Sequence, residues 1–72
     1  MGIDIRRRIG REINHLRTDR GMVQQVLADR AGLSRRMLSK IENGHVEPSI
    51  TVLFALLHVL GVKASEFFKS IE

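Results

Sequence analysis

The side chains best suited to binding another molecule gather in one short stretch, residues 34–43, with the sequence SRRMLSKIEN. Three of them, Arg35, Arg36 and Lys40, are cationic. Arginine can donate two parallel hydrogen bonds to O6 and N7 of guanine, and both residue types bind phosphate. The stretch therefore predicts a surface that contacts nucleic acid. The alternative is that these charges form the solvated face of an ordinary helical hairpin.

Two short amphipathic helices within residues 24–43 must position these cations. Apolar residues at helical spacing give each helix one buried face, as at Leu38 and Ile41 in the second helix. Gly32 suits the positive φ of a turn between them, and Ser34 is a suitable N-cap for the second helix. A helix with arginines on its outer face fits the major groove of B-DNA. The residues of this helix that lie off its apolar stripe are Ser34, Arg35, Arg36, Met37, Ser39, Lys40 and Asn43.

The composition is that of a small basic domain. The chain has 72 residues, a net charge of +4 and no cysteine, so neither a disulfide nor a thiolate metal site is available. Residues 1–44 hold ten Lys and Arg against five Asp and Glu, whereas residues 45–72 hold two against three. This asymmetry indicates a half that faces a polyanion and a half with another role. We expect a single domain over residues 1–72.

The sequence predicts neither a membrane segment nor export. The longest apolar-rich run, residues 50–62, contains Thr51, His58 and Gly61 and is too short to span a bilayer. The N-terminus lacks the apolar core of a secretory signal. We therefore expect a cytoplasmic protein that makes no membrane contact.

Three further helices are predicted around the central pair. A first helix, with Asp4 as its expected cap, extends through about Arg20 and carries apolar residues at i, i+4, i+8 and i+11 from Ile5. Ser49 is the expected cap of a helix over residues 50–60, and a short last helix covers about residues 64–70.

Four arginines crowd the first turns of the first helix, where the helix dipole disfavours positive charge. Phosphate is one candidate reason for their presence, and Arg11 is the expected contact. A solvated face that keeps the protein soluble explains each of them equally well. The four residues are Arg6, Arg7, Arg8 and Arg11.

Five segments of the chain carry a family resemblance. They are LRTDRGM (16–22), QQVLADRAGLS (24–34), LSKIENG (38–44), PS (48–49) and LGVKASEFF (60–68). Over about sixty residues, in order and without gaps, the chain resembles the phage repressor/Cro-type helix-turn-helix proteins, also called the XRE family. The resemblance implies an all-α, compact five-helix bundle that is lambda-repressor-like, with its helix-turn-helix at residues 24–43. It also implies operator binding as a dimer and regulation of transcription.

The resemblance assigns the base-reading positions to the second helix of the pair. Arg35, Arg36 and Lys40 match residues that reach base edges, with Met37 and Ser39 beside them. Because arginine suits guanine, we expect G·C pairs in the half-site. Met37 either touches a thymine methyl group or is a partly buried packing residue.

Other roles implied by the resemblance are phosphate binding and bracing. Gln24 matches a glutamine that contacts phosphate and braces the motif, and Asn43 matches a phosphate contact after the recognition helix. Arg17 and Glu42 match a structural ion pair that links the first helix to the recognition helix. The expected phosphate contacts are Gln24, Ser34, Asn43 and Arg11.

Three positions depart from the family pattern. Val23 stands where the family usually has a side-chain cap for the first helix of the motif, a loss of about 1 kcal/mol. Val26 replaces a usual acidic residue, and Lys63 replaces the usual cap of the last helix. None of them is a base-reading position.

The helix predicted over residues 50–60 is apolar on nearly every side. Ile50, Leu53, Leu57 and Leu60 form one apolar set, and a second set lies on a different face. Since so small a monomer is not expected to bury both, we predict a homodimer that binds an inverted repeat, with recognition helices roughly 34 Å apart. The alternative is that the last helix and the C-terminal tail cover the second face. The expected interface comprises Val52, Ala55, Leu56, Val59, Phe67 and Phe68.

Two other functional classes are alternatives to a DNA-binding regulator. An enzyme is disfavoured because the three histidines are widely spaced and no nucleophile or metal motif occurs. We expect no catalytic residue, cofactor, metal or small-molecule substrate. The second class is a DNA-binding antitoxin or a protein-interaction module whose apolar residues 50–60 bind a different protein. Our interpretation is a bacterial or phage-encoded sequence-specific transcriptional regulator, acting as a repressor on double-stranded DNA.

Overall fold

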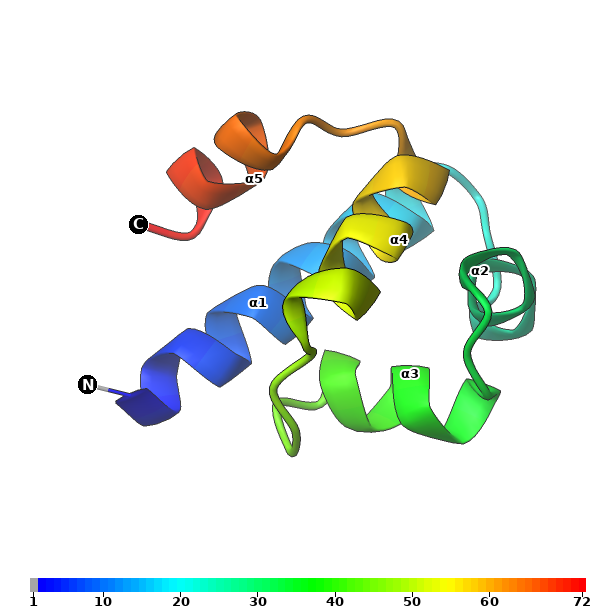
Figure 1. The fold of residues 1–72 in the computed structure, drawn as a ribbon, viewed down its shortest axis with the longest axis horizontal. Helices are drawn as coiled ribbons and strands as arrows, with labels where there is room; N and C mark the ends of the chain where they lie inside the picture. The colour runs from blue at the N-terminus through cyan, green and yellow to red at the C-terminus, as the bar shows by residue number, and fades with distance from the viewer. Residues whose placement is uncertain (1) are drawn as a thin grey trace.

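The computed structural model describes residues 2–72, with side chains from Ile5 onward, and in this range the chain forms five helices and no strand (Figure 1). The all-α fold predicted from the sequence is therefore confirmed. In Figure 1, α3 lies along the lower edge, α2 lies at the right, and α4 crosses in front of α1. The helices are α1 (Gly2–Asp19), α2 (Gln24–Ala31), α3 (Arg35–Glu42), α4 (Ile50–Leu60) and α5 (Ala64–Ser70).

Side-chain caps and a glycine turn set the ends of the central helices. The hydroxyls of Ser34 and Ser49 each accept a hydrogen bond of 3.1 Å from the backbone amide three residues further on. Gly32 ends α2 with a φ of 77°, a left-handed conformation that favours glycine. Neither Val23 nor Lys63 provides a side-chain cap for α2 or α5, as their residue types predicted.

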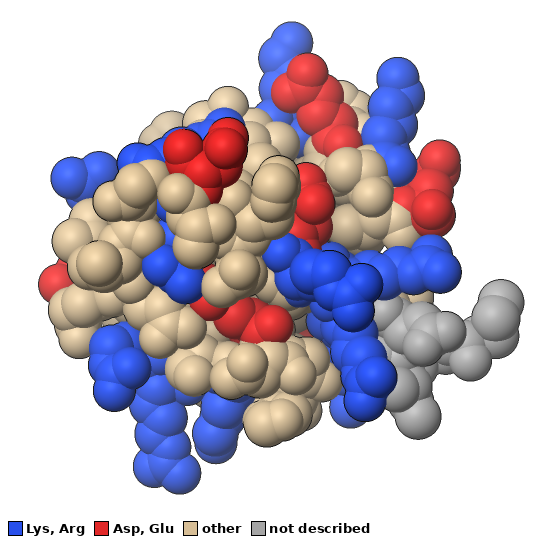
Figure 2. Space-filling model, turned by 180° about the vertical axis from the view of Figure 1, so that it is seen from behind, with Lys and Arg blue, Asp and Glu red and all other residues tan. Residues whose placement is uncertain are grey.

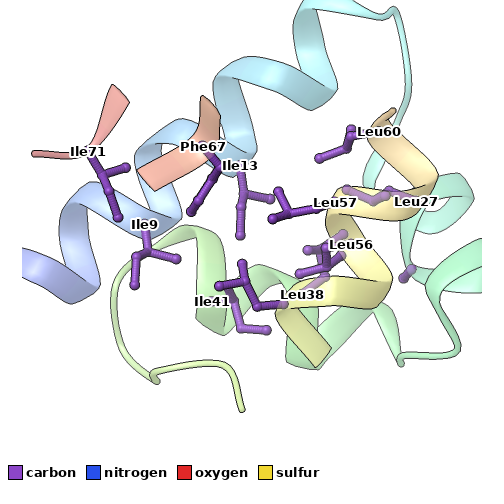
Figure 3. Close-up of a cluster of buried hydrophobic side chains, with 12 residues drawn as sticks. Ile9, Ile13, Leu27, Leu38, Ile41, Leu56, Leu57, Leu60, Phe67 and Ile71 are labelled. Atoms are coloured by element: carbon purple, nitrogen blue, oxygen red, sulfur yellow. The ribbon is translucent and has the colours of Figure 1, made fainter. Parts of the chain in front are cut away.

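All five helices contribute to one hydrophobic core (Figure 3). Ile13 from α1, Leu38 from α3 and Leu57 from α4 point toward one another at its centre. Each buried side chain of this size contributes roughly 1.5–3 kcal/mol. Arg20 adds a polar tie, because its Nε donates to the carbonyl oxygen of Leu60 over 2.7 Å. The buried apolar residues are Ile9, Ile13, Leu27, Ala28, Leu38, Ile41, Leu53, Leu56, Leu57, Leu60, Phe67 and Ile71.

Helix α4 departs most from the expectation. Leu56 and Phe67, predicted to form a dimer interface, are 0% and 1% exposed and belong to the monomer core. Leu56 is enclosed because α2 packs against α4, which brings Leu27 into the same core. Conversely, Ile50 belongs to the same apolar set as the buried Leu53 and Leu57 but is 61% exposed, because it lies at the start of the helix, away from the core.

The first helix also differs at its N-terminal end. It begins at Gly2, two residues before the predicted cap, and Ile5 is exposed although its spacing predicted burial. The first turns of α1 therefore extend past the core.

No single helix within residues 2–72 is long and apolar enough to cross a membrane. The segments Ile50–Leu60 and Ala64–Ile71 pass such a test only when they are taken together, by length and composition, and they are bent by 104°.

Candidate nucleic-acid interface

A short turn joins α2 to α3 and fixes the angle between them. The amide of Leu33 donates to the carbonyl of Ala28 over 2.8 Å, which closes the turn after the left-handed Gly32. Leu38 and Ile41 then anchor the inner face of α3 in the core. Helices α2 and α3 thus form a rigid helix-turn-helix unit whose other face is open.

The outer face of α3 carries the cations. At 100° per residue, Arg36, Lys40 and Asn43 lie opposite the buried Leu38 and Ile41. Arg36 and Asn43 are exposed, and Lys40 is half-buried. The three form a polar ridge along the helix.

The remaining predicted base-reading residues flank this ridge. Met37 is exposed on one side, and Ser39 is half-buried on the other, where its hydroxyl accepts a hydrogen bond of 3.3 Å from Asn43 Nδ2. Arg35 is exposed but points toward α2, because its Nη1 lies 3.5 Å from Gln24 Oε1.

A buried ion pair holds α3 against α1. Arg17 donates from Nε to Glu42 Oε2 over 2.7 Å and from Nη2 to Glu42 Oε1 over 3.0 Å. Its Nη1 donates to the carbonyl of Met22 over 2.7 Å, before α2 begins. Glu42 Oε1 also accepts hydrogen bonds from Asn14 Nδ2 (2.9 Å) and Gln24 Nε2 (3.0 Å). The expected pair is therefore present, at the centre of a network that joins α1, α2 and α3.

This network keeps Glu42 ionised. Burial alone would raise the pKa of its carboxyl group. The hydrogen bonds that it accepts, first from Arg17 and then from the amides of Asn14 and Gln24, together with the Arg17 charge, outweigh burial and lower the pKa below its ordinary value of 4.5. A fully hydrogen-bonded carboxylate with an adjacent guanidinium is the arrangement in which a buried charge is tolerated.

Gly10 is a structural residue that the sequence analysis did not identify. It lies where α1 meets the end of α3, and a Cβ atom there would stand 2.2 Å from the carbonyl oxygen of Ile41 and 2.6 Å from that of Glu42. Only glycine permits this approach. The sequence does carry a signal for this role. A glycine inside an amphipathic helix lowers the stability of the helix by about 1 kcal/mol relative to alanine, so its presence indicates a packing reason.

The four arginines at the start of α1 have different surroundings. Arg6 pairs with Glu47 over 3.6 Å at the surface, and Arg8 donates from Nη1 to the carbonyl of Ile71 over 3.3 Å. Arg7 lies beside Gly44, and together with Arg11 it lines an open cleft of about 460 Å³. The other residues that line this cleft, which we call the α1–α3 cleft, are Asn14, Glu42 and Asn43.

Charge is unevenly distributed over the molecule (Figure 2). Basic side chains project from the lower edge, where α3 lies, and also from the top, whereas most of the acidic side chains visible in this view are in the upper half. Within the described part of the chain, no group of three or more His, Cys, Asp or Glu side chains is placed to hold a metal ion. The features of this surface are those of an anion-binding face.

Known proteins are similar to this chain in sequence and in fold. A family model described as Helix-turn-helix matches residues 13–67. The HTH-type transcriptional regulator y4dJ of Sinorhizobium fredii is 33% identical over 64 residues, which cover 89% of this chain and 83% of that protein. The immunity repressor protein of Bacillus phage phi105 is 37% identical over 57 residues, which cover 79% of this chain and 40% of the repressor.

Two further comparisons extend this relationship. The HTH-type transcriptional regulator PuuR of Escherichia coli is 36% identical over 63 residues, which cover 88% of this chain but only 34% of PuuR. The crystal structure of the clp gene regulator ClgR from Corynebacterium glutamicum matches with a TM-score of 0.89 at 27% identity, covering 93% of this chain and 71% of that chain. This chain thus spans most of y4dJ but well under half of PuuR and of the phage repressor. The chain belongs to the XRE-type helix-turn-helix family of DNA-binding transcriptional regulators.

Proposed function

We propose that this protein represses transcription by binding an inverted-repeat operator through α3. The observation that carries the proposal is the ridge of Arg36, Lys40 and Asn43, which faces away from a core that fixes α3 in place. An α-helix with its side chains is about 10–12 Å in diameter, and the major groove is roughly 12 Å wide. The helix therefore fits the groove with its ridge toward the base edges.

Within this ridge, Arg36 and Lys40 are the proposed main base contacts. Both lie opposite the buried face of α3, and the bidentate contact of arginine or lysine with guanine is the commonest specific contact in the major groove. Arg35, Met37 and Ser39 are the proposed flanking contacts. The Arg35 guanidinium is partly held by Gln24, so it approaches the DNA from the side of α2.

The phosphate contacts that we propose surround this helix. Gln24 gives one amide hydrogen to Glu42 and retains a second one for a phosphate oxygen. Ser34 and Asn43 flank α3 at its two ends, and Arg11 lies on α1 beside the α1–α3 cleft. Most of the affinity should come from such contacts and should fall steeply with salt.

Selection of bound sequences from a random pool of duplexes tests base reading. Arg36→Ala should then cost about 1–3 kcal/mol on the selected site and relax the preference at one position. Arg30→Ala is the matched control, because it removes an exposed arginine from α2 rather than from the α3 ridge. Equal losses on selected and random DNA for Arg36→Ala would refute the assignment.

We further propose that two copies bind together through α4 and α5. Ile50 and Phe54 lie one helical turn apart on α4 and are 61% and 52% exposed, and Phe68 on α5 is exposed as well. Helix α4 contains no Asp, Glu, Lys or Arg, so two copies can meet there without charge repulsion. Of the residues expected at this interface, Val52, Ala55 and Val59 are half-buried, and they lie on the other side of α4 from Ile50 and Phe54.

Sedimentation of the free protein tests the homodimer. Phe54→Glu should give a folded monomer that binds an inverted repeat weakly, because it places a charge on an exposed apolar face. Val23→Glu is the control, since Val23 is 62% exposed at the N-cap of α2, away from α4 and α5, and the change should leave the dimer intact. A wild-type protein that sediments as a monomer at all concentrations would refute the homodimer. That result would favour the alternative, in which the α4 face binds a different protein, as an antitoxin would.

The repressor role and the cytoplasmic location belong to the same proposal. One relative carries the name immunity repressor protein, and a regulator must work where its DNA is. Transcription in vitro from a promoter that overlaps the selected operator should fall as protein is added. A rise in transcript would make the protein an activator.

A further inference from the structure

We infer that the α1–α3 cleft is a second phosphate-binding site, through which α1 follows the DNA backbone beyond the base pairs that α3 reads. This inference rests on the proposed function, because it takes α3 to lie in the major groove. It adds Arg7 and Asn14 to the Arg11 contact already proposed, so that α1 binds more than one phosphate.

The first observation is that only two of four neighbouring arginines have partners within the described part of the protein. Arg6 and Arg8 have partners within the protein, the Glu47 carboxylate and the Ile71 carbonyl. Arg7 and Arg11, one helical turn apart, line the cleft instead. Arg11 also borders a second hollow, on the side of Arg8 and Ile71. Among the residues with described side chains, no carboxylate lies within ion-pair distance of either one.

The second observation is the charge balance of the cleft. Its one acidic residue, Glu42, is already neutralised by Arg17 and saturated with hydrogen bonds. The two guanidinium groups therefore leave a net positive cleft, and the exposed amide of Asn43 adds a further donor at its rim. Guanidinium groups bind phosphate oxygens in pairs, whereas a metal cation would be repelled here.

The third observation is the position of the cleft. It adjoins Asn43 at the C-terminal end of α3, so a duplex seated on α3 brings a backbone strand to its mouth. From Asn14 to Arg7 the helix rises about 10 Å, which equals the axial rise of roughly three nucleotides of one strand. The edge of α1 can therefore follow a short run of phosphates rather than touch one.

The test combines charge removal with duplex length. Arg7→Gln with Arg11→Gln removes both charges but keeps the Cβ and Cγ methylene groups, including the Arg7 Cγ that lies beside Gly44. Arg6→Gln with Arg8→Gln is the matched control, since it removes the same charge from the same helix outside the cleft. Thermal melting confirms that both variants fold. DNA binding is measured from 50 to 200 mM salt on two duplexes that contain the selected site. One duplex ends at the outer edge of each half-site, and the other extends beyond it on both sides.

The cleft variant should lower the salt slope by about 1.8 per chain, which corresponds to losing two phosphate contacts at about 0.9 each. Over this fourfold salt range the wild type should then lose about tenfold more affinity than the variant for each chain bound, which is on the order of a hundredfold for two chains on an inverted repeat. Longer flanks should tighten binding for the wild type and for the control, but not for the cleft variant.

Two results would overturn the inference. In the first, the cleft variant and the control lose the same affinity for DNA. In the second, longer flanks tighten DNA binding by the cleft variant as much as they tighten binding by the control. In either case Arg36→Ala would still change base preference, so the proposed function would stand. If instead the wild-type protein binds all duplexes with the same affinity, the proposed function itself is refuted. Inorganic phosphate added at constant ionic strength should compete only weakly, and selective release of the DNA by millimolar phosphate would show that the cleft binds the free ion instead.

Discussion

Replacing Gly10 with alanine is the change that most directly tests how α1 and α3 are held together. Helix propensity alone predicts that Gly10→Ala stabilises the protein by about 1 kcal/mol, since glycine is a poor residue inside a helix. The structure predicts the opposite sign. The new Cβ atom would stand 2.2 Å from the Ile41 carbonyl oxygen, about 1.2 Å short of the 3.4 Å at which ordinary contact begins.

This clash cannot be relieved by rotating a side chain, because its partners are backbone atoms of Ile41 and Glu42. Helix α1 must therefore move away from α3 by about 1 Å. Such a shift would stretch the 2.9 Å hydrogen bond from Asn14 to Glu42 beyond useful length. Overpacking costs about 1–3 kcal/mol, and the weakened network adds to it, so we expect a net loss of roughly 2 kcal/mol after the gain in propensity.

Circular dichroism during thermal and urea denaturation measures this loss. For a domain of this size, 2 kcal/mol corresponds to a Tm lower by roughly 8–16 °C. Gly21→Asn is the control, because Gly21 has a φ of 68°, which asparagine tolerates, and no atom lies within 4 Å of a Cβ there. A Gly10→Ala protein as stable as the wild type, or more stable, would refute the close approach of the two helices.

Three further predictions concern the ion pair and the helix cap. Arg17→Met should lower the free energy of unfolding, measured by urea denaturation, by about 3–5 kcal/mol, because it leaves the buried Glu42 carboxylate without its partner. Adding Glu42→Leu should recover much of this loss. Equal losses in the single and double variants would contradict the prediction. Because the pKa of Glu42 is lowered in the folded protein, its contribution is complete above the unfolded value, near 4.5, and is lost as the pH falls through the folded value. Acid titration of Glu42→Gln should therefore show a flatter decline than the wild type. Val23→Ser should raise the free energy of unfolding by about 1 kcal/mol, and the Tm by roughly 4–8 °C, because it supplies the side-chain cap that α2 lacks.

Much of the fold followed from local signals. Ser34, Ser49 and Gly32 mark helix ends through short-range hydrogen bonds or a backbone conformation that the residue type itself favours. Their positions needed no knowledge of the rest of the chain. The partnership of Arg17 with Glu42 is different, because the two are far apart in sequence and only the family resemblance indicated it.

What the sequence could not supply was the relation between helices. Both apolar sets on α4 have helical spacing, so spacing alone could not show that α2 would bury Leu56 while Ile50 stayed exposed. In the same way, four adjacent arginines are equivalent by sequence. Only the packing of the loop after α3 and of the C-terminal end against α1 distinguishes Arg6 and Arg8 from Arg7 and Arg11.

One contact links stability to the proposed DNA binding. Gly10 lies between Arg7 and Arg11 on α1, so the spacing that it sets between α1 and α3 is also the width of the cleft that these arginines line. Moving α1 outward by about 1 Å would therefore change the salt slope as well as the Tm. Replacing the two arginines should change the slope and leave the Tm nearly intact, since neither side chain is part of the core. Measuring both quantities on both variants separates the effect of helix spacing from that of charge.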